Sequence, residues 1–133
     1  MTATRGLLDT SVVIDWHDPA VARALPDEVA ISAITTAELT AGPHLAATPG
    51  EAANRQARLQ EVEARFEPIP FDGTAARSYG LVVAAVVSEG RKPRSRFADL
   101  VIAATAHAHG LDLYTRIGAD FAGLDHLVRV ISI

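Results

Sequence analysis

Gly6-Leu7-Leu8-Asp9-Thr10-Ser11 is the stretch on which the predicted fold depends. Leu7 and Leu8 are adjacent apolar residues, without the alternation of a half-exposed strand, which indicates a strand covered on both faces. Asp9 comes where that strand should end, and open parallel sheets place their chemistry beyond the carboxyl ends of the strands. Asp9 is therefore either a turn residue that bonds its own backbone or a ligand that points into a site.

The rest of the chain alternates between predicted strands and predicted helices. The strands expected after the first one are residues 29–34, 67–71, 111–115 and 127–133. Pro68 and Pro70 favour an edge position for the strand at 67–71, because proline cannot donate to a ladder. The alternation predicts one domain over residues 1–133, an α/β fold built as a three-layer α/β/α sandwich with a mostly parallel five-stranded sheet.

Composition excludes several classes of protein. The chain has 133 residues, enough for one core, and no cysteine, so disulfides, thiolate zinc sites and cysteine nucleophiles are excluded. No apolar run approaches the roughly 20 residues of a membrane span, and the first residues do not resemble a signal peptide. We therefore expect a soluble, cytoplasmic protein without membrane contact. The net charge of −4 argues against bulk binding of nucleic acid, but it permits a nuclease with local bases.

Three further acids are predicted at the sheet edge where Asp9 lies. Glu38 follows the second strand, where it fits either a capping box with Thr35 or a carboxylate turned towards a site. Asp99 is the only charged residue in an otherwise apolar helix. It either interacts with the helix dipole or belongs to a site, because a lone buried carboxylate is costly. Asp120 follows the strand at 111–115, either as an ordinary loop residue or as a fourth acid of the site.

Carboxylates that gather without lysine or arginine between them repel one another, and a hard divalent cation resolves the repulsion. All-oxygen sites suit Mg²⁺ or Mn²⁺, and such ions activate water and stabilise charge on a phosphodiester. The predicted catalytic residues are Asp9, Glu38, Asp99 and Asp120, whose carboxylates would gather around such an ion. The hydroxyls predicted to support these ligands or metal-bound waters belong to Thr10, Ser11 and Thr115.

Four stretches resemble the signature blocks of the PIN domain, most closely those of the VapC-type toxins of bacterial toxin–antitoxin pairs. They are residues 7–11 (LLDTS), 34–39 (ITTAEL), 98–104 (ADLVIAA) and 113–116 (LYTR). The resemblance implies a Mg²⁺- or Mn²⁺-dependent endoribonuclease, with metal ligands at Asp9, Glu38 and Asp99, that cleaves structured RNA, often tRNA or rRNA. It also implies a cognate VapB-type antitoxin that blocks the site, and a homodimer. Ile117 departs from the pattern, because relatives commonly carry Asn or Asp at that position.

Basic residues gather directly before the helix that carries Asp99. Residues 91–96 contain four of them, which form either a solvated loop or a phosphate-binding lip beside the acidic site. The predicted RNA-binding residues are Arg91, Lys92, Arg94, Arg96 and Arg116.

Two alternatives to a toxin remain open at this level. One is a PIN-like nuclease of RNA processing, and the other is a catalytically weak module that binds RNA or a partner, which Ile117 favours. A nucleotide-binding doubly wound domain is disfavoured, because the chain contains neither a G-x-G-x-x-G sequence nor a P-loop.

Overall fold

A computed structural model describes residues 4–133 of the chain. Its centre is a parallel sheet with the strand order β2-β1-β3-β4. The strands are β1 (Arg5–Leu8), β2 (Glu28–Ile31), β3 (Asp112–Thr115) and β4 (Val130–Ser132). Leu8 at the end of β1 lies in register with Ile31 on one side and Tyr114 on the other. The carboxyl ends of the strands therefore meet at one edge of the sheet.

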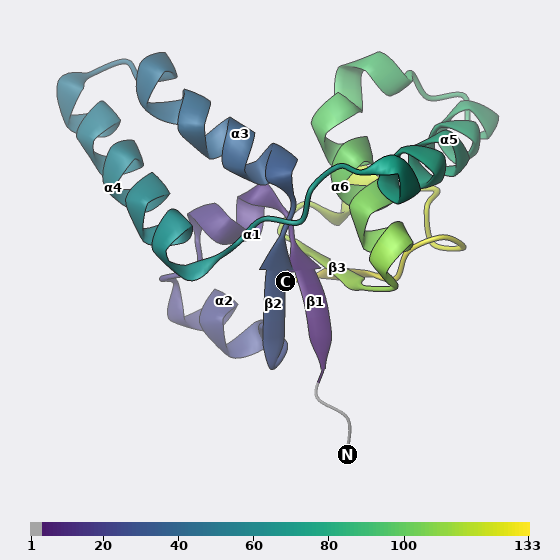
Figure 1. Cartoon of the computed structure of the whole chain (residues 1–133), viewed down its shortest axis with the longest axis horizontal. Coiled ribbons are helices and arrows are strands. Elements are labelled where there is room, and N and C mark those ends of the chain that lie inside the picture. The colour runs from purple at the N-terminus through teal and green to yellow at the C-terminus, as the bar shows by residue number, and fades with distance from the viewer. Residues whose placement is uncertain (1–3) are drawn as a thin grey trace.

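Helices cover both faces of this sheet (Figure 1). In Figure 1, α3 and α4 form one arm and α5 and α6 the other, and the two arms diverge above the strands. The α-helices are α1 (Thr10–Ile14), α2 (Pro19–Ala24), α3 (Ala33–Ala41), α4 (Pro49–Arg65), α5 (Gly73–Ser88) and α6 (Phe97–His109). The short 3₁₀ helices are η1 (Gly42–Leu45), η2 (Pro93–Arg96) and η3 (Gly118–Phe121).

The adjacent leucines of β1 serve two separate cores. Leu7 packs with Leu100 of α6 and Leu113 of β3 on one face of the sheet, whereas Leu8 packs with the first four helices on the other. Both leucines are fully buried, and each contributes about 1.5–3 kcal/mol to the free energy of unfolding. The predicted three-layer α/β/α architecture is thereby confirmed, because a strand covered on both faces needs helices on both sides.

The predicted strand count of five is wrong, because the segment at 67–71 is not a strand. Ile69 alone pairs with the end of β2, through a single parallel bridge to Ser32. Its amide donates to the carbonyl of Ile31 and its carbonyl accepts from the amide of Ala33, both at 2.9 Å. The chain turns into α3 directly after Ser32, so the segment meets β2 only at its last residues. Its predicted position at the edge of the sheet is right.

The helix that carries Asp99 is the most deeply packed segment of the core that contains Leu7. Residues 100–106 of α6 are all buried, and Gly110 ends the helix with a left-handed φ of 63°. No side chain caps its amino end, where Arg96 occupies the N-cap position. Within residues 4–133, no helix has both the length and the apolar character needed to cross a membrane.

Candidate active site

Asp9 is both a helix cap and a buried carboxylate, so the two interpretations of this residue are compatible. It is the N-cap of α1, and its Oδ1 accepts from the Val12 amide at 3.1 Å. The same oxygen accepts from the Ser11 hydroxyl at 2.6 Å, and Oδ2 accepts from Thr115 at 2.5 Å. Asp9 is only 5% exposed, so these donors stabilise a carboxylate that water hardly reaches.

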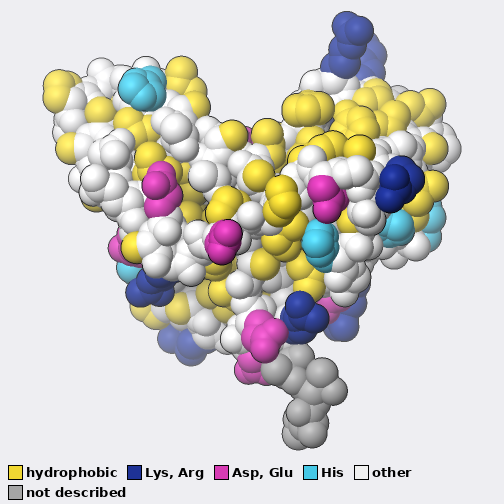
Figure 2. Space-filling model, viewed as in Figure 1, with side chains coloured by type: hydrophobic (Ala, Val, Ile, Leu, Met, Phe, Trp, Pro, Cys, Tyr) yellow, Lys and Arg dark blue, Asp and Glu magenta, His cyan; other side chains and the backbone are white. Residues whose placement is uncertain are grey.

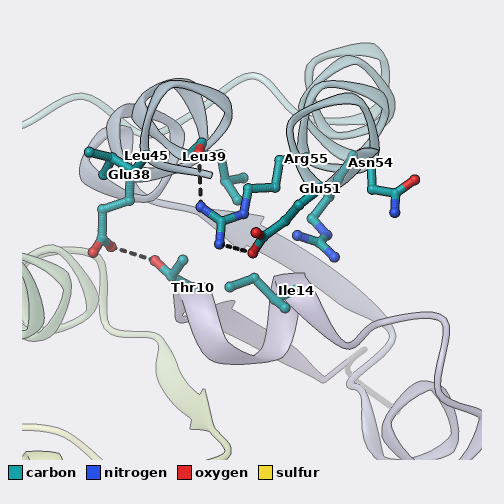
Figure 3. Close-up of a pocket in the computed structure, with 10 residues that line it drawn as sticks. Thr10, Ile14, Glu38, Leu39, Leu45, Glu51, Asn54 and Arg55 are labelled. Atoms are coloured by element: carbon teal, nitrogen blue, oxygen red, sulfur yellow. Dashed lines mark hydrogen bonds and ion pairs between the residues drawn. The ribbon is translucent and has the colours of Figure 1, made fainter. Parts of the chain in front are cut away.

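Glu38 is not part of a capping box, because α3 begins earlier than the sequence predicted. Ser32 caps this helix by accepting from the amide of Ile34 at 3.2 Å, which places Thr35 and Glu38 inside the helix. The Glu38 carboxylate instead accepts a 2.6 Å hydrogen bond from the hydroxyl of Thr10 on α1 (Figure 3). The Thr10 oxygen also lies 3.1 Å from that of Thr35, which is fully buried. The sequence did not reveal this role of Thr35.

The other three acids of the predicted site affect the pKa of Asp99. Burial raises its pKa to about 6, and the negative charges of Asp120, Asp9 and Glu38 act in the same direction. Arg96 partly opposes them. Asp99 therefore lies close enough to acids of three other segments for their charge to affect its pKa.

Asp120 lies in η3 and is held there by Arg96. The Arg96 guanidinium donates to the backbone carbonyl of Asp120 at 2.8 Å and lies 3.4 Å from its carboxylate. Arg91 donates to the neighbouring carbonyl of Ala119 at 3.3 Å. Arg91 and Arg96 of the predicted RNA-binding run thus stabilise the loop that carries Asp120. The sequence did not indicate this role.

The other predicted RNA-binding residues differ in their surroundings. Arg116 forms ion pairs with Asp15 at 3.0 Å and Asp18 at 3.8 Å. Lys92 and Arg94 are exposed, and neither side chain has a hydrogen bond or ion pair with any of residues 4–133. Contact with RNA stays a prediction for all five residues, although Lys92 and Arg94 have no competing partner among the described residues.

Ile117 contributes no oxygen to the site. Its amide donates to the Thr115 hydroxyl at 3.0 Å, and its side chain is 51% exposed. The backbone at this position therefore supports Thr115, and through it Asp9, while the side chain cannot bind a cation.

The set of donors fits a hard divalent cation. Every candidate ligand is a carboxylate or hydroxyl oxygen, four acids interact, and Arg96 is the one cation that counters them at Asp99. Within the described residues, no three His, Cys, Asp or Glu side chains stand close enough together to hold an ion. The carboxylates are instead hydrogen-bonded individually, Asp9 by Ser11 and Thr115 and Glu38 by Thr10. The site thus provides the charge and the ligand type for a cation.

Comparisons with known proteins identify the family of this chain. The PIN domain family matches residues 6–126. Ribonuclease VapC5 of Mycobacterium tuberculosis is 40% identical over 134 residues, which cover 97% of this chain and 94% of the relative. Ribonuclease VapC4 of the same organism is 35% identical over 138 residues and the whole of both chains. The crystal structure of VapBC-5, a member of the VapBC family of toxin–antitoxin systems from M. tuberculosis, superposes with a TM-score of 0.83 and 39% identity over 98% of this chain and 99% of that chain. The chain therefore belongs to the PIN domain family, among its VapC proteins.

Proposed function

We propose that this chain is a metal-dependent endoribonuclease, the toxin of a VapBC-type toxin–antitoxin pair, that cleaves structured RNA such as tRNA or rRNA. The observation that carries the proposal is the environment of Asp99, whose pKa is raised by burial and by Asp120, Asp9 and Glu38. Such an arrangement is unfavourable without a counter-charge. It suits a site that functions with Mg²⁺ or Mn²⁺ bound.

The chain's own residues prepare the site for hydrolysis. Ser11 and Thr115 fix the two oxygens of Asp9, and Thr10 fixes Glu38, so the carboxylates are oriented before substrate arrives. Asp9, Glu38 and Asp99 would hold the cation. When bound, the cation supplies charge neutralisation and an activated water for attack on the phosphodiester. Asp120 would orient a water, from the position in which Arg96 holds it.

The names of the relatives support the substrate and the partner. VapC5 and VapC4 are named ribonucleases, and the VapBC-5 structure is that of a toxin–antitoxin system. We extend both to this chain as cleavage of RNA and binding of a cognate VapB-type antitoxin.

The surface offers a place for a protein partner, either the antitoxin or a second copy in a homodimer. Figure 2 shows hydrophobic side chains gathered in the hollow between the two arms. An apolar groove of about 270 Å³ is lined by residues of α3 and α6 together with the exposed side chains of Phe71 and Phe97. Exposed apolar patches of this kind mark protein interaction sites.

A catalytically weak RNA-binding module is a second candidate, favoured by Ile117. Its side chain supplies no oxygen where relatives commonly carry Asn or Asp. Titration of the purified chain with Mn²⁺ by calorimetry separates the two functions, because a ribonuclease of this kind must bind the ion and a binding module need not.

The experiment that tests the proposal is brief expression of the chain followed by sequencing of the 5′ ends of RNA fragments. We expect discrete cleavage sites that disappear with Asp9→Asn or Asp99→Asn and persist with Glu28→Gln. Glu28 begins β2, at the opposite end of the strands, and pairs with Arg5 on the surface. Cleavage by either Asn variant at the rate of the unmodified chain would falsify the site. Growth arrest that a co-expressed antitoxin from a neighbouring gene relieves distinguishes a toxin from an RNA-processing nuclease.

A further inference from the structure

A cavity of about 550 Å³ adjoins the acidic cluster on the side of α4 (Figure 3). It is bounded by α1, α3, η1 and α4, and Thr10 and Glu38 form part of its wall. These are the two residues whose 2.6 Å hydrogen bond orients the Glu38 carboxylate. The cavity is therefore continuous with the site, and its volume lies in the range of about 300–1,000 Å³ typical of ligand pockets.

Arg55 gives the cavity a fixed, planar wall. Its guanidinium donates to the carbonyl of Gly42 at 2.9 Å and to Glu51 at 2.6 Å, as the dashed lines in Figure 3 show. The pairing balances the charge of Glu51 and holds the plane of the guanidinium in place. Leu39 and Ile14 supply apolar wall beside it. Planar guanidinium groups and apolar side chains are the surfaces on which unpaired nucleobases stack.

Arg58 follows on the same face of α4 and lines the same cavity. Its side chain is half-buried, and it has no hydrogen bond or ion pair with any residue in the described range 4–133. A partly buried guanidinium without a counter-charge is costly unless a ligand supplies one. Phosphate matches it best, because two parallel hydrogen bonds join the planar fork to two phosphate oxygens.

We propose that this cavity binds one nucleotide of the RNA beside the scissile phosphodiester, with its base against Arg55 and the apolar wall and its phosphate on Arg58. The inference rests on the proposed ribonuclease function and adds a subsite to it. A peptide of a protein partner is the other occupant of suitable size. RNA is favoured because the cavity shares Thr10 and Glu38 with the acidic site and because the unpaired charge is a cation.

The test compares cleavage of a short single-stranded RNA by Arg58→Gln, Arg58→Lys and the unmodified chain. We expect Arg58→Gln to raise KM about tenfold, with the nucleotide preferred beside the cut, kcat and Mn²⁺ affinity unchanged, because a phosphate contact does not read the base. Arg58→Lys should recover part of the loss because it keeps the charge. Asn54 is an exposed residue of α4 that lines the cavity. Asn54→Trp should fill part of the cavity and raise KM as well. Arg23→Gln on α2, also exposed, is the matched control, and thermal unfolding confirms that each variant folds.

Binding provides a measurement that does not depend on catalysis. A fluorescent RNA hexamer should bind the Asp99→Asn chain about tenfold more weakly once Arg58→Gln is added. Unchanged KM and hexamer affinity in Arg58→Gln would overturn the subsite. Normal cleavage by Arg58→Gln combined with escape from the antitoxin would also overturn it and assign the cavity to the protein partner. Absence of cleavage by the unmodified chain would count against the proposed function alone, because the hexamer still reports on the cavity.

Discussion

Thr115 donates a 2.5 Å hydrogen bond to the carboxylate of Asp9 across 106 residues of sequence. The two residues are adjacent in space because β1 and β3 are neighbouring strands and both residues lie at the carboxyl ends of these strands. Thr115 is fully buried and also accepts from the amide of Ile117. One hydroxyl thus joins the candidate ligand to the loop that leads to Asp120.

Thr115→Val should lower the free energy of unfolding by about 1–3 kcal/mol and reduce RNA cleavage. The change keeps the shape of the side chain but leaves an oxygen of Asp9 and the amide of Ile117 without their partner. Urea unfolding and RNA cleavage measure the two effects. Thr105→Val is the matched control, because the Thr105 hydroxyl only bonds the Val101 carbonyl within α6. Thr115→Ser should restore most of the loss, and equal stability of the two valine variants would contradict the prediction.

The metal-free chain should lose stability as the pH rises through the titration of Asp99. Its pKa is raised from the ordinary 3.8 of an aspartate to about 6 by burial and by three neighbouring acids, so the folded state binds more protons between these values. The free energy of unfolding therefore falls as the pH rises from about 4 to above 6, by about 1–2 kcal/mol after allowance for solvent screening.

Asp99→Asn should remove this dependence. Urea unfolding in EDTA should show the variant to be more stable than the unmodified chain at pH 7.5, with the difference lost near pH 4. A difference that does not vary with pH would assign the effect to packing rather than to charge.

Divalent cations should restore the stability that the unmodified chain loses when Asp99 is ionised. A ligand that binds only the folded state stabilises by about 2.7 kcal/mol at one hundred times its dissociation constant. We expect Mn²⁺ to raise the melting temperature of the unmodified chain and of Glu28→Gln, and to have little effect on Asp9→Asn or Asp99→Asn. An equal rise in all four proteins would mean that the ion binds elsewhere.

The sequence named three supporting hydroxyls, and the structure shows each of them hydrogen-bonded to a candidate acid, Ser11 and Thr115 to Asp9 and Thr10 to Glu38. The carboxyl ends of parallel strands share an edge, so Asp9 and Asp120 were predicted there from their places after two strands, whereas Asp99 was singled out as the one charged residue of an otherwise apolar helix. The start of α3 was predicted too late because Thr35 and Glu38 satisfy the capping-box pattern as well as Ser32 satisfies a simple cap. The packing of α1 decides between the two caps, because the Thr10 hydroxyl of α1 donates to the Glu38 carboxylate, which is then not used for a capping box.

The contacts made by long side chains could not be predicted from the sequence. Arg91 and Arg96 stand in a run that indicates a phosphate-binding lip, yet both donate to carbonyls of η3 more than twenty residues away. On α4, Arg55 donates to the carbonyl of Gly42 in η1, 13 residues earlier in the chain. Neither contact follows from local pattern, because each depends on how η3 and η1 pack.

Gly6 should tolerate no side chain, although it lies in a strand. A Cβ at this position would meet the ring of Tyr114 and come within 3.0 Å of Pro26. Tyr114 is itself buried, so Gly6→Ala should cost about 1–3 kcal/mol of stability. Gly80→Ala in α5 is the matched control, because its Cβ meets nothing within 4 Å and should stabilise the helix by about 1 kcal/mol. Denaturant unfolding of the two variants should therefore shift in opposite directions.

Arg96 and Arg94 should have separable effects, although both belong to the basic run. Arg96→Ala releases Asp120 and removes the cation that lowers the pKa of Asp99, so the acid limb of the pH–rate profile should shift to higher pH and the maximal rate should fall. Arg94→Ala removes an exposed charge and should weaken RNA binding and reduce its salt dependence, with the pH profile unchanged. Cleavage rates from pH 5 to 9 and binding at two salt concentrations measure the difference. A shifted profile in Arg94→Ala, or an unshifted one in Arg96→Ala, would contradict the assignment of this pKa effect to Arg96.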